Sequence, residues 1–138
     1  LLLMFSSRNE LIQNKIIPAL NDRKWEISDR FTDASFAYQG GGRMLNLDRI
    51  TKLEEWVQGT FQPDLTLLLD VSVDIGMKRI EVRKEKDRIE KEERAFFERV
   101  RSGFIERSKL YPERIKLIDA SRSIDEVQNQ IQSLLESL

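Results

Sequence analysis

The sequence predicts an α/β fold, in which helices flank a parallel sheet, and three observations support that prediction. Segments in which apolar residues recur at helical spacing alternate with short apolar runs. Residues 65–70 are almost continuously apolar, which is typical of a parallel strand that is covered on both faces. The chain has 138 residues, the size of one domain, with no internal repeat and no long linker.

A helix followed by a short strand is predicted at the start of the chain. Residues 1–20 have helical spacing, and Pro18 predicts a kink or a restart, because a proline deep inside a helix removes a hydrogen bond. Residues 25–28 form the predicted strand, which ends at Asp29.

A glycine loop and a second helix are expected next. Residues 40–42 are three consecutive glycines, which do not favour regular structure and therefore predict a loop. Asn46 is suited to cap a helix that runs to about residue 58, with Gly59 just past its end. The apolar face of this helix is predicted to contain Leu47, Ile50, Leu53 and Val57.

The second half of the chain predicts helices around two strands. The strand at 65–70 is followed by a helix at about 75–83 and by another that ends near residue 109. A last strand is expected at 115–118, and Ser123 with Glu126 forms the pattern of a capping box. The residues expected to face inward from these helices are Phe97, Val100, Phe104, Val127, Ile131, Leu134 and Leu138.

Composition excludes several kinds of chemistry. The 23 basic and 24 acidic residues give a net charge of −1, which argues against a nucleic-acid partner. Cysteine and histidine are absent, which excludes disulfides, thiolate or imidazole metal sites and histidine-based catalysis. The apolar residues 1–5 are too short to cross a membrane and lack a charged leader, so we expect a cytoplasmic protein without a membrane partner.

The segment from Asp29 to Arg43 contains the clearest functional signal. Arg30 offers a planar fork that matches phosphate oxygens, at the end of a predicted strand where α/β proteins bind ligands. By itself, an Asp-Arg pair is more often a surface ion pair. Tyr38 and Gln39 share a helical face with Ser35, and glutamine can both donate to and accept from a pyrimidine edge. A capped helix followed by a mobile loop would have the same pattern.

The whole run resembles the nucleotide-binding signature of thymidylate kinases of the bacterial type, and the likeness extends over essentially all of the chain. It implies the fold of P-loop nucleoside monophosphate kinases and transfer of a phosphoryl group from ATP to dTMP, giving dTDP. It also implies that the N-terminal strands and the P-loop, G-x-x-x-x-G-K-[ST], are not among these residues. We therefore expect a single, partial kinase domain that is inactive without a P-loop.

The resemblance assigns roles around dTMP, in a part that spans residues 1–60. Asp29 would lie near the transferred phosphate and reach its Mg²⁺ through water, not as a direct ligand. Arg30 would bind the dTMP phosphate, while Ser35 and Gln39 face thymine and Tyr38 shapes the pocket. Residues 5–8 look like the Phe-x-x-Arg of the family, in which Phe5 stacks on thymine and Arg8 contacts its carbonyl edge. A phenylalanine at helical spacing is more often a core residue, but an arginine on the same face is unusual in a plain core.

A charged segment follows the strand at 65–70. Residues 81–94 include 12 charged side chains, six of each sign, which by pattern alone predicts a solvated helix. The resemblance makes residues 79–94 the lid over ATP, with Arg83 or Arg88 as the catalytic arginine that stabilises the transferred phosphoryl group. Arg79, and Arg122 in the loop before the terminal helix, would bind ATP. The C-terminal strand and helix would span residues 115–138.

Three hypotheses stay open at this point. The first is a thymidylate kinase that takes ATP with Mg²⁺, forms a homodimer as family members do, and includes more than these residues. The second is a non-catalytic fragment that binds dTMP or only self-associates, and the third is a kinase of another nucleoside monophosphate. In the resembled sheet, the absent first strand would lie between the strands at 25–28 and 65–70. We therefore expect unpaired strand edges and no native monomer from these residues alone.

Overall fold

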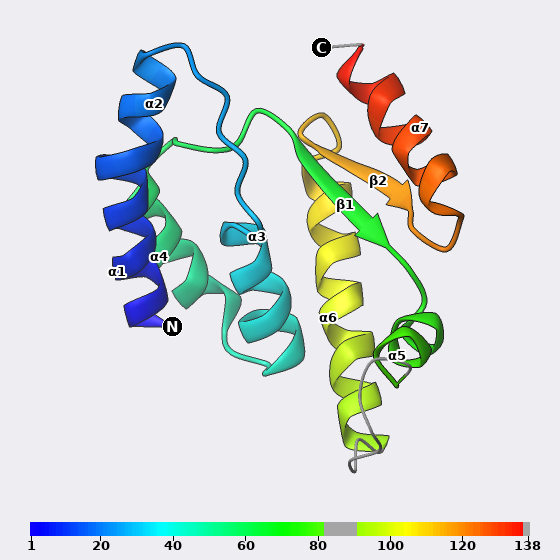
Figure 1. Ribbon diagram of the computed structural model, residues 1–138. Coiled ribbons are helices and arrows are strands. Elements are labelled where there is room, and N and C mark those ends of the chain that lie inside the picture. The colour runs from blue at the N-terminus through cyan, green and yellow to red at the C-terminus, as the bar shows by residue number, and fades with distance from the viewer. Residues whose placement is uncertain (82–90, 137–138) are drawn as a thin grey trace. The chain divides into compact units, whose positions relative to one another are not determined.

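The computed structural model describes residues 1–81 and 91–136, and the chain forms two compact units (Figure 1). The N-terminal unit, Leu1–Gln62, is helical. The C-terminal unit, Pro63–Leu138, contains both strands of the described residues. None of the helices in the described ranges is long and apolar enough to span a membrane.

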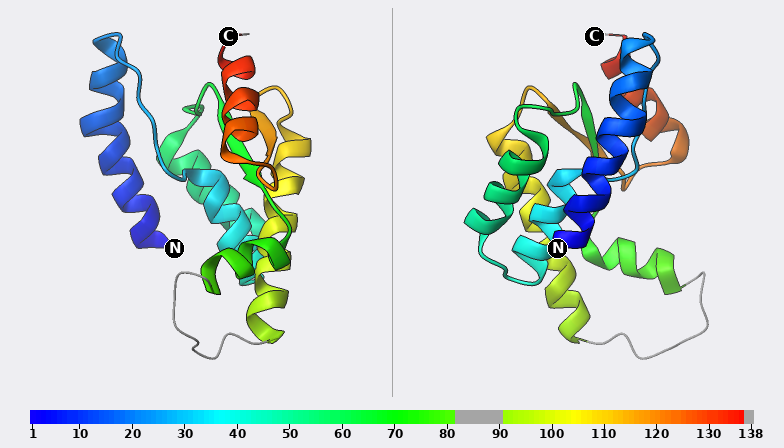
Figure 2. Two further views of the ribbon diagram at one scale, coloured as in Figure 1. Left: turned by 45° about the vertical axis from the view of Figure 1, so that its right-hand side comes forward. Right: turned by 90° about the vertical axis from the view of Figure 1, so that its left-hand side faces the viewer.

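The N-terminal unit begins with one rod made of three consecutive helical segments, drawn in blue in Figures 1 and 2. These are α1 (Leu2–Leu11), the π-helix η1 (Ile12–Ile16) and α2 (Ile17–Asn21). The restart predicted at Pro18 is confirmed in that a new α-helical segment begins at Ile17, whose N–H donates to the Ile12 carbonyl in the last π turn. The wider π turns just before it are an irregularity often found inside helices.

The glycine run does not form the predicted loop. It completes the π-helix η2 (Phe36–Gly42), which continues directly from the short helix α3 (Thr32–Ser35). The Arg43 N–H donates to the Tyr38 carbonyl at 2.9 Å, five residues back, as in a π turn. A Cβ added at Gly40 would lie 2.3 Å from Cδ2 of Leu47. Glycine thus lets the Leu47 side chain lie against η2, whereas a Cβ at this position would require that exposed side chain to turn away.

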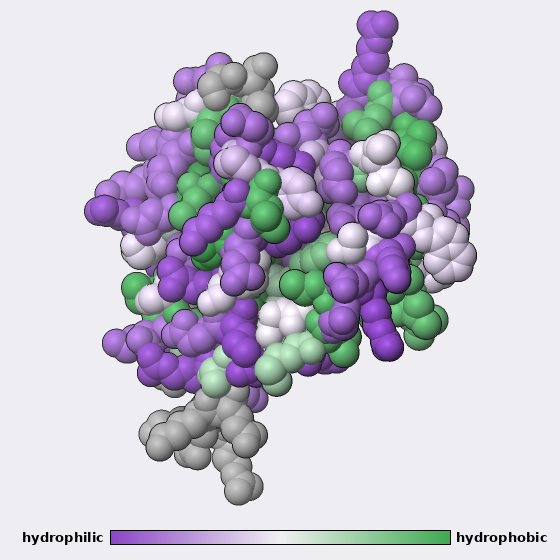
Figure 3. All heavy atoms as spheres, turned by 180° about the vertical axis from the view of Figure 1, so that it is seen from behind, coloured by the Kyte–Doolittle hydropathy of each residue, from purple (hydrophilic) through white to green (hydrophobic). Residues whose placement is uncertain are grey.

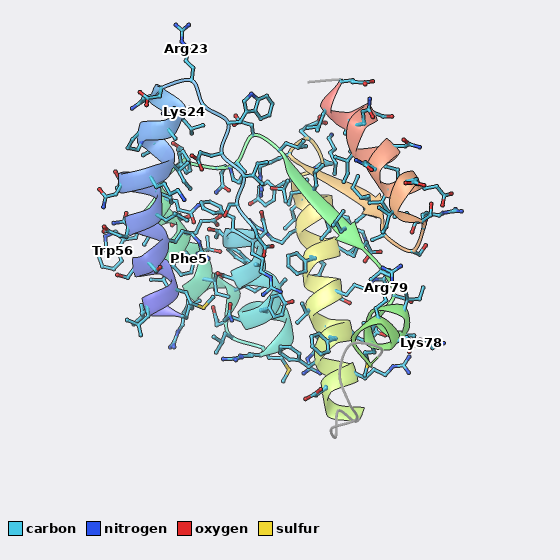
Figure 4. All side chains as sticks on the ribbon, viewed as in Figure 1. Phe5, Arg23, Lys24, Trp56, Lys78 and Arg79 are labelled. Carbon is cyan, nitrogen blue, oxygen red and sulfur yellow. The ribbon has the colours of Figure 1, made fainter. Side chains whose placement is uncertain are left out.

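Helix α4 (Leu47–Gln58) completes the core of the N-terminal unit. The Asn46 side chain accepts a hydrogen bond from the Arg49 N–H at 3.2 Å, so the predicted cap is confirmed. Phe5 of α1, which is labelled in Figure 4, packs with Phe36 of η2 and Ile50 of α4. Leu53 and Val57 are partly buried against this cluster, whereas Leu47 is exposed.

The strand predicted at residues 25–28 is not formed. The segment is irregular, and Ile27 is 94% exposed. A strand is stabilised by the hydrogen bonds of a ladder, and no described strand pairs with this segment. Asp29 and Arg30 therefore lie in an exposed connection before α3 and not at a strand end.

The C-terminal unit is the α/β part of the chain. Strands β1 (Thr66–Asp70) and β2 (Ile115–Asp119) pair in parallel, with Leu68 opposite Leu117. Its helices are α5 (Val73–Glu81), α6 (Lys91–Leu110) and α7 (Ile124–Leu135). The sheet lies between α6 and α7 (Figures 1 and 2), and α6 packs against both strands. A parallel sheet flanked by helices was predicted, and it is confirmed for these two strands.

Burial in the C-terminal unit is less complete than the apolar pattern predicted. Leu69 is 55% exposed, so β1 is not covered on both faces. The predicted capping box of Ser123 and Glu126 is present. The residues of α7 that were predicted to face inward are only half-buried, and Leu138 lies outside the described residues. Val100 of α6 is buried as predicted. Figure 3 shows further apolar side chains among hydrophilic ones on one face of the molecule.

Candidate functional site

Arg8 is the centre of the candidate site in the N-terminal unit. It projects from α1, and its Nη2 donates to Oγ of the buried Ser35 at 3.0 Å. The guanidinium carbon lies 4.6 Å from the ring centroid of Phe5 and 5.5 Å from that of Phe31. The family resemblance placed Phe5, Arg8 and Ser35 around one ligand, and the fold brings these three side chains together, with Arg8 and Ser35 separated by 27 residues of chain.

Three buried polar atoms of the N-terminal unit lack hydrogen-bond partners among the residues that the structure describes. They are the Arg8 Nη1, a donor, and the Gln39 Oε1 and Gln62 Oε1, both acceptors. Gln39 lies one turn beyond Ser35 in η2. Buried polar groups are nearly always satisfied in native proteins, so an unpartnered donor on Arg8 and an unpartnered acceptor on Gln39 call for an explanation. A ligand edge that offers one acceptor and one donor would satisfy both.

Opposite charge surrounds Arg8. Burial lowers the pKa of its guanidinium, while the nearby carboxylates of Glu54 and Asp33 act against that effect and raise it. Both carboxylates are themselves buried, on α4 and α3 respectively. Their charge compensates that of Arg8, which would otherwise be costly to hold in the interior.

The exposed end of the predicted motif lies in the same unit. The Arg30 guanidinium carbon lies 5.1 Å from the ring centroid of Tyr38, a cation–π contact that holds its fork beside η2. Arg30 has a φ of 66°, which costs energy for a residue other than glycine, and Ser28 Oγ donates to its carbonyl at 3.0 Å. Asp29 is exposed beside it. Strained backbone of this kind is common at ligand sites.

The residues predicted to contact ATP divide between described and undescribed parts of the chain. In the C-terminal unit, Arg79 of α5 donates from Nη1 to the Ala120 carbonyl at 3.0 Å (Figure 4). Arg122 lies in the same loop, where its Nε is 2.9 Å from Oδ2 of Asp119. The fold thus brings Arg79 close to the loop that carries Arg122, at the carboxyl ends of the strands. Arg83 and Arg88 lie outside the described residues.

Sequence reasoning missed the buried polar side chains of α4 and the residues that bond to them. Glu54 accepts from Gln62 Nε2 at 2.9 Å, and Thr32 donates to the Gln58 side chain. Glu54 and Gln58 are buried on α4. A signal was present, because Glu54 lies four residues from Ile50 and three from Val57, on the apolar stripe of that helix.

Comparison with known proteins gives a consistent family. A family model described as thymidylate kinase matches residues 1–131. The thymidylate kinase of Ruthia magnifica subsp. Calyptogena magnifica is 59% identical over 138 residues, which are 100% of this chain and 67% of that protein. That of Vesicomyosocius okutanii subsp. Calyptogena okutanii is 60% identical with the same coverage. The thymidylate kinase of Nitrosospira multiformis is 51% identical over 99% of this chain and 67% of its own length. The chain belongs to the thymidylate kinase family.

Proposed function

We propose that the N-terminal unit binds dTMP for an enzyme that transfers a phosphoryl group from ATP to dTMP. The observation that supports the proposal is the pair of buried, unpartnered atoms, the Arg8 Nη1 donor and the Gln39 Oε1 acceptor. Thymine matches this pair, because its O4 accepts a hydrogen bond and its adjacent N3–H donates one. Both atoms would then be satisfied in the complex.

The same two atoms favour thymine over cytosine. Cytosine has an amino group in place of O4, and arginine has no acceptor to offer to that group. A glutamine can turn its amide to suit either base, but Arg8 cannot reverse its role. Arg8 is also held in place by Ser35 and by the rings of Phe5 and Phe31, so moving away from an amino group would break these contacts. That the Phe5 ring also stacks on thymine stays a prediction.

The phosphate of dTMP is assigned to Arg30. Its guanidinium is exposed and rests on the Tyr38 ring, so its fork can bind phosphate oxygens in two-pronged fashion. ATP enters as its Mg²⁺ complex, and the exposed Asp29 carboxylate is suited to contact that ion through water. The transfer is in line and needs no covalent intermediate, so these residues act by position and charge.

Two other functions compete with this one. A chain that binds dTMP without transferring phosphate would keep the same site and differ in the assay for dTDP. A kinase of another nucleoside monophosphate would bind dCMP or dGMP at least as well as dTMP. One set of measurements separates all three.

The test is isothermal titration calorimetry of the 138-residue chain with dTMP, dCMP and dGMP, followed by a dTDP assay with ATP and Mg²⁺ on a protein that carries a P-loop segment upstream of these residues. We expect one dTMP site with a Kd at least about tenfold below that of dCMP or dGMP. Arg8→Lys should weaken dTMP binding by about tenfold or more, because lysine lacks the planar fork. Arg49→Lys, an exposed position on α4, is the matched control. No dTMP binding, or equal binding of the other nucleotides, would refute the proposal.

A further inference from the structure

Glu54 is a buried acid in the core of the N-terminal unit. It is 8% exposed and lies on α4, the helix that packs against α1, from which Arg8 projects. Its Oε1 accepts a hydrogen bond from Gln62 Nε2 at 2.9 Å. Gln62 follows α4 in the last part of the unit, so this contact joins the helix to the segment that leaves it.

A buried carboxylate near a half-buried arginine is expected to form a hydrogen-bonded ion pair, because charge-assisted hydrogen bonds are strong. The Nη1 atom of Arg8 does not form such an ion pair with any described residue. This atom is buried and donates to none of the residues that the structure describes, although the charge of Glu54 acts on Arg8. Arg8 instead uses Nη2, toward Ser35. Within the described residues, one N–H donor of the Arg8 guanidinium, at Nη1, is therefore free to bind a ligand.

Gln62 accounts for the restraint on Glu54. Its amide nitrogen donates to the carboxylate, and its own Oε1 stays buried without a hydrogen-bond partner in the described ranges. The contact with Glu54 therefore leaves the other atom of the Gln62 amide unsatisfied, which destabilises the fold. A contact maintained at that cost is a reason to look for a role beyond packing.

We propose that Gln62 is a positioning residue, which holds the Glu54 carboxylate near enough to compensate the charge of Arg8 but away from its Nη1, so that this donor stays available to a pyrimidine carbonyl. The inference rests on the proposed function, because it concerns the same donor. Asp33 also supplies negative charge to Arg8, so the loss of Glu54 alone leaves the arginine partly compensated.

The test compares three variants by calorimetric titration with dTMP. In Gln62→Ala, Glu54 is released and can bond to Arg8 Nη1, so dTMP binding should weaken by about tenfold. In the double variant Glu54→Gln/Gln62→Ala, the released side chain is neutral and competes poorly, so binding should return to within about threefold of the unaltered chain. Glu54→Gln alone should bind dTMP to within that same range. Recovery through a second substitution is a result that simple loss of packing would not give.

Controls and outcomes separate the inference from the proposed function. Gln13→Ala and Glu55→Gln change exposed residues of the same types and should leave binding unchanged. Far-UV circular dichroism checks that each variant is folded, and Gln62→Asn, which shortens the amide, replaces Gln62→Ala if that variant is unfolded. If Gln62→Ala binds dTMP normally, or if the double variant binds as poorly as the single one, the positioning role is wrong and the dTMP site stands. If the unaltered chain binds no dTMP, both proposals fail.

Discussion

Arg101 of α6 and Asp70 of β1 form a two-pronged ion pair, in which Nε to Oδ1 and Nη2 to Oδ2 both measure 2.7 Å. The hydrogen bonds to Asp70 raise the pKa of Arg101. The Asp70 side chain is 17% exposed and that of Arg101 is 39% exposed, so solvent weakens the pair only in part. The pair joins the carboxyl end of β1 to the helix that packs against both strands. It therefore fixes the end of the sheet at which Arg79 meets the loop of Arg122.

We predict that Arg101→Ala lowers the free energy of unfolding by about 1 kcal/mol, and that Arg101→Lys recovers less than half of this loss. Lysine keeps the charge but cannot make two parallel hydrogen bonds. Urea denaturation followed by circular dichroism measures the effect. Ser102→Ala, an exposed position on the same helix, is the control. Equal stability of Arg101→Ala and the unaltered chain would show that the pair contributes nothing.

The free energy of unfolding at acid pH should depend on two carboxylates at the start of α7. The hydrogen bond from the Ser123 hydroxyl lowers the pKa of Glu126 below its ordinary 4.5, and that from Ser121 lowers the pKa of Asp119 below 3.8. A lowered pKa in the folded state gives stabilisation that is present above the ordinary pKa and is lost as the pH falls through the folded value. Stability should therefore decline below about pH 4.5.

Ser123→Ala tests this dependence directly. The variant should be less stable than the unaltered chain at pH 7, because the hydroxyl no longer accepts from the Glu126 N–H or donates to Oε2 of Glu126, and only the bond from the backbone N–H of residue 123 to Glu126 stays. The difference should shrink as the pH falls and Glu126 becomes protonated. Ser133→Ala, on the exposed side of α7, should show a difference that does not change with pH. A constant difference for Ser123→Ala as well would contradict the assigned linkage.

Two glycines should respond in opposite directions to alanine. Gly59 ends α4 with a φ of 57°, so Gly59→Ala should cost about 1 kcal/mol even though no atom lies within 4 Å of the added Cβ. Gly76 lies inside α5, where a Cβ would meet Cγ1 of Val71 at an ordinary 3.8 Å. Gly76→Ala should therefore stabilise the chain by about 0.5–1 kcal/mol. Denaturation curves of the two variants decide this, and equal signs would show that backbone conformation is not the deciding factor.

Gln39→Met should make the chain more stable and weaken its binding of dTMP. The substitution removes a buried acceptor that has no partner in the described residues, so the free energy of unfolding should rise by about 1 kcal/mol. Binding of dTMP should weaken by about tenfold or more, because thymine N3–H loses its acceptor. Thermal denaturation and calorimetry measure the two effects, with the exposed Gln13→Met as the control. A variant that is less stable, or that binds dTMP normally, would contradict the assigned role of Gln39.

Features fixed by neighbouring residues were predictable from the sequence. The cap at Asn46, the capping box at Ser123 and the restart at Pro18 depend on side chains within one helical turn, and all three are confirmed. Only the family resemblance placed Arg8 and Ser35 at one ligand, and the hydrogen bond between them was not predicted. Helical spacing alone left Phe5 as a core residue, and it is indeed buried.

Features that depend on distant partners were not predictable. The segment 25–28 has the composition of a strand but lacks a ladder partner among the described residues. The glycines at 40–42 are part of a helix, and the Leu47 side chain lies against Gly40, a contact that no local pattern reveals. The link from Gln62 to Glu54 depends on how the chain turns after α4. Each of these is decided by packing, which overrides local propensity.

The most direct test of the dTMP site is to follow the two unpartnered groups themselves by nuclear magnetic resonance. The side-chain amide of Gln39 and the guanidinium of Arg8 would be assigned with Gln39→Met and Arg8→Lys, and titrated with dTMP. If thymine binds as proposed, both signals shift together and saturate at one dTMP per chain, while the exposed Gln128 amide does not move. Signals of Gln39 and Arg8 that stay unchanged at saturating dTMP would contradict the account.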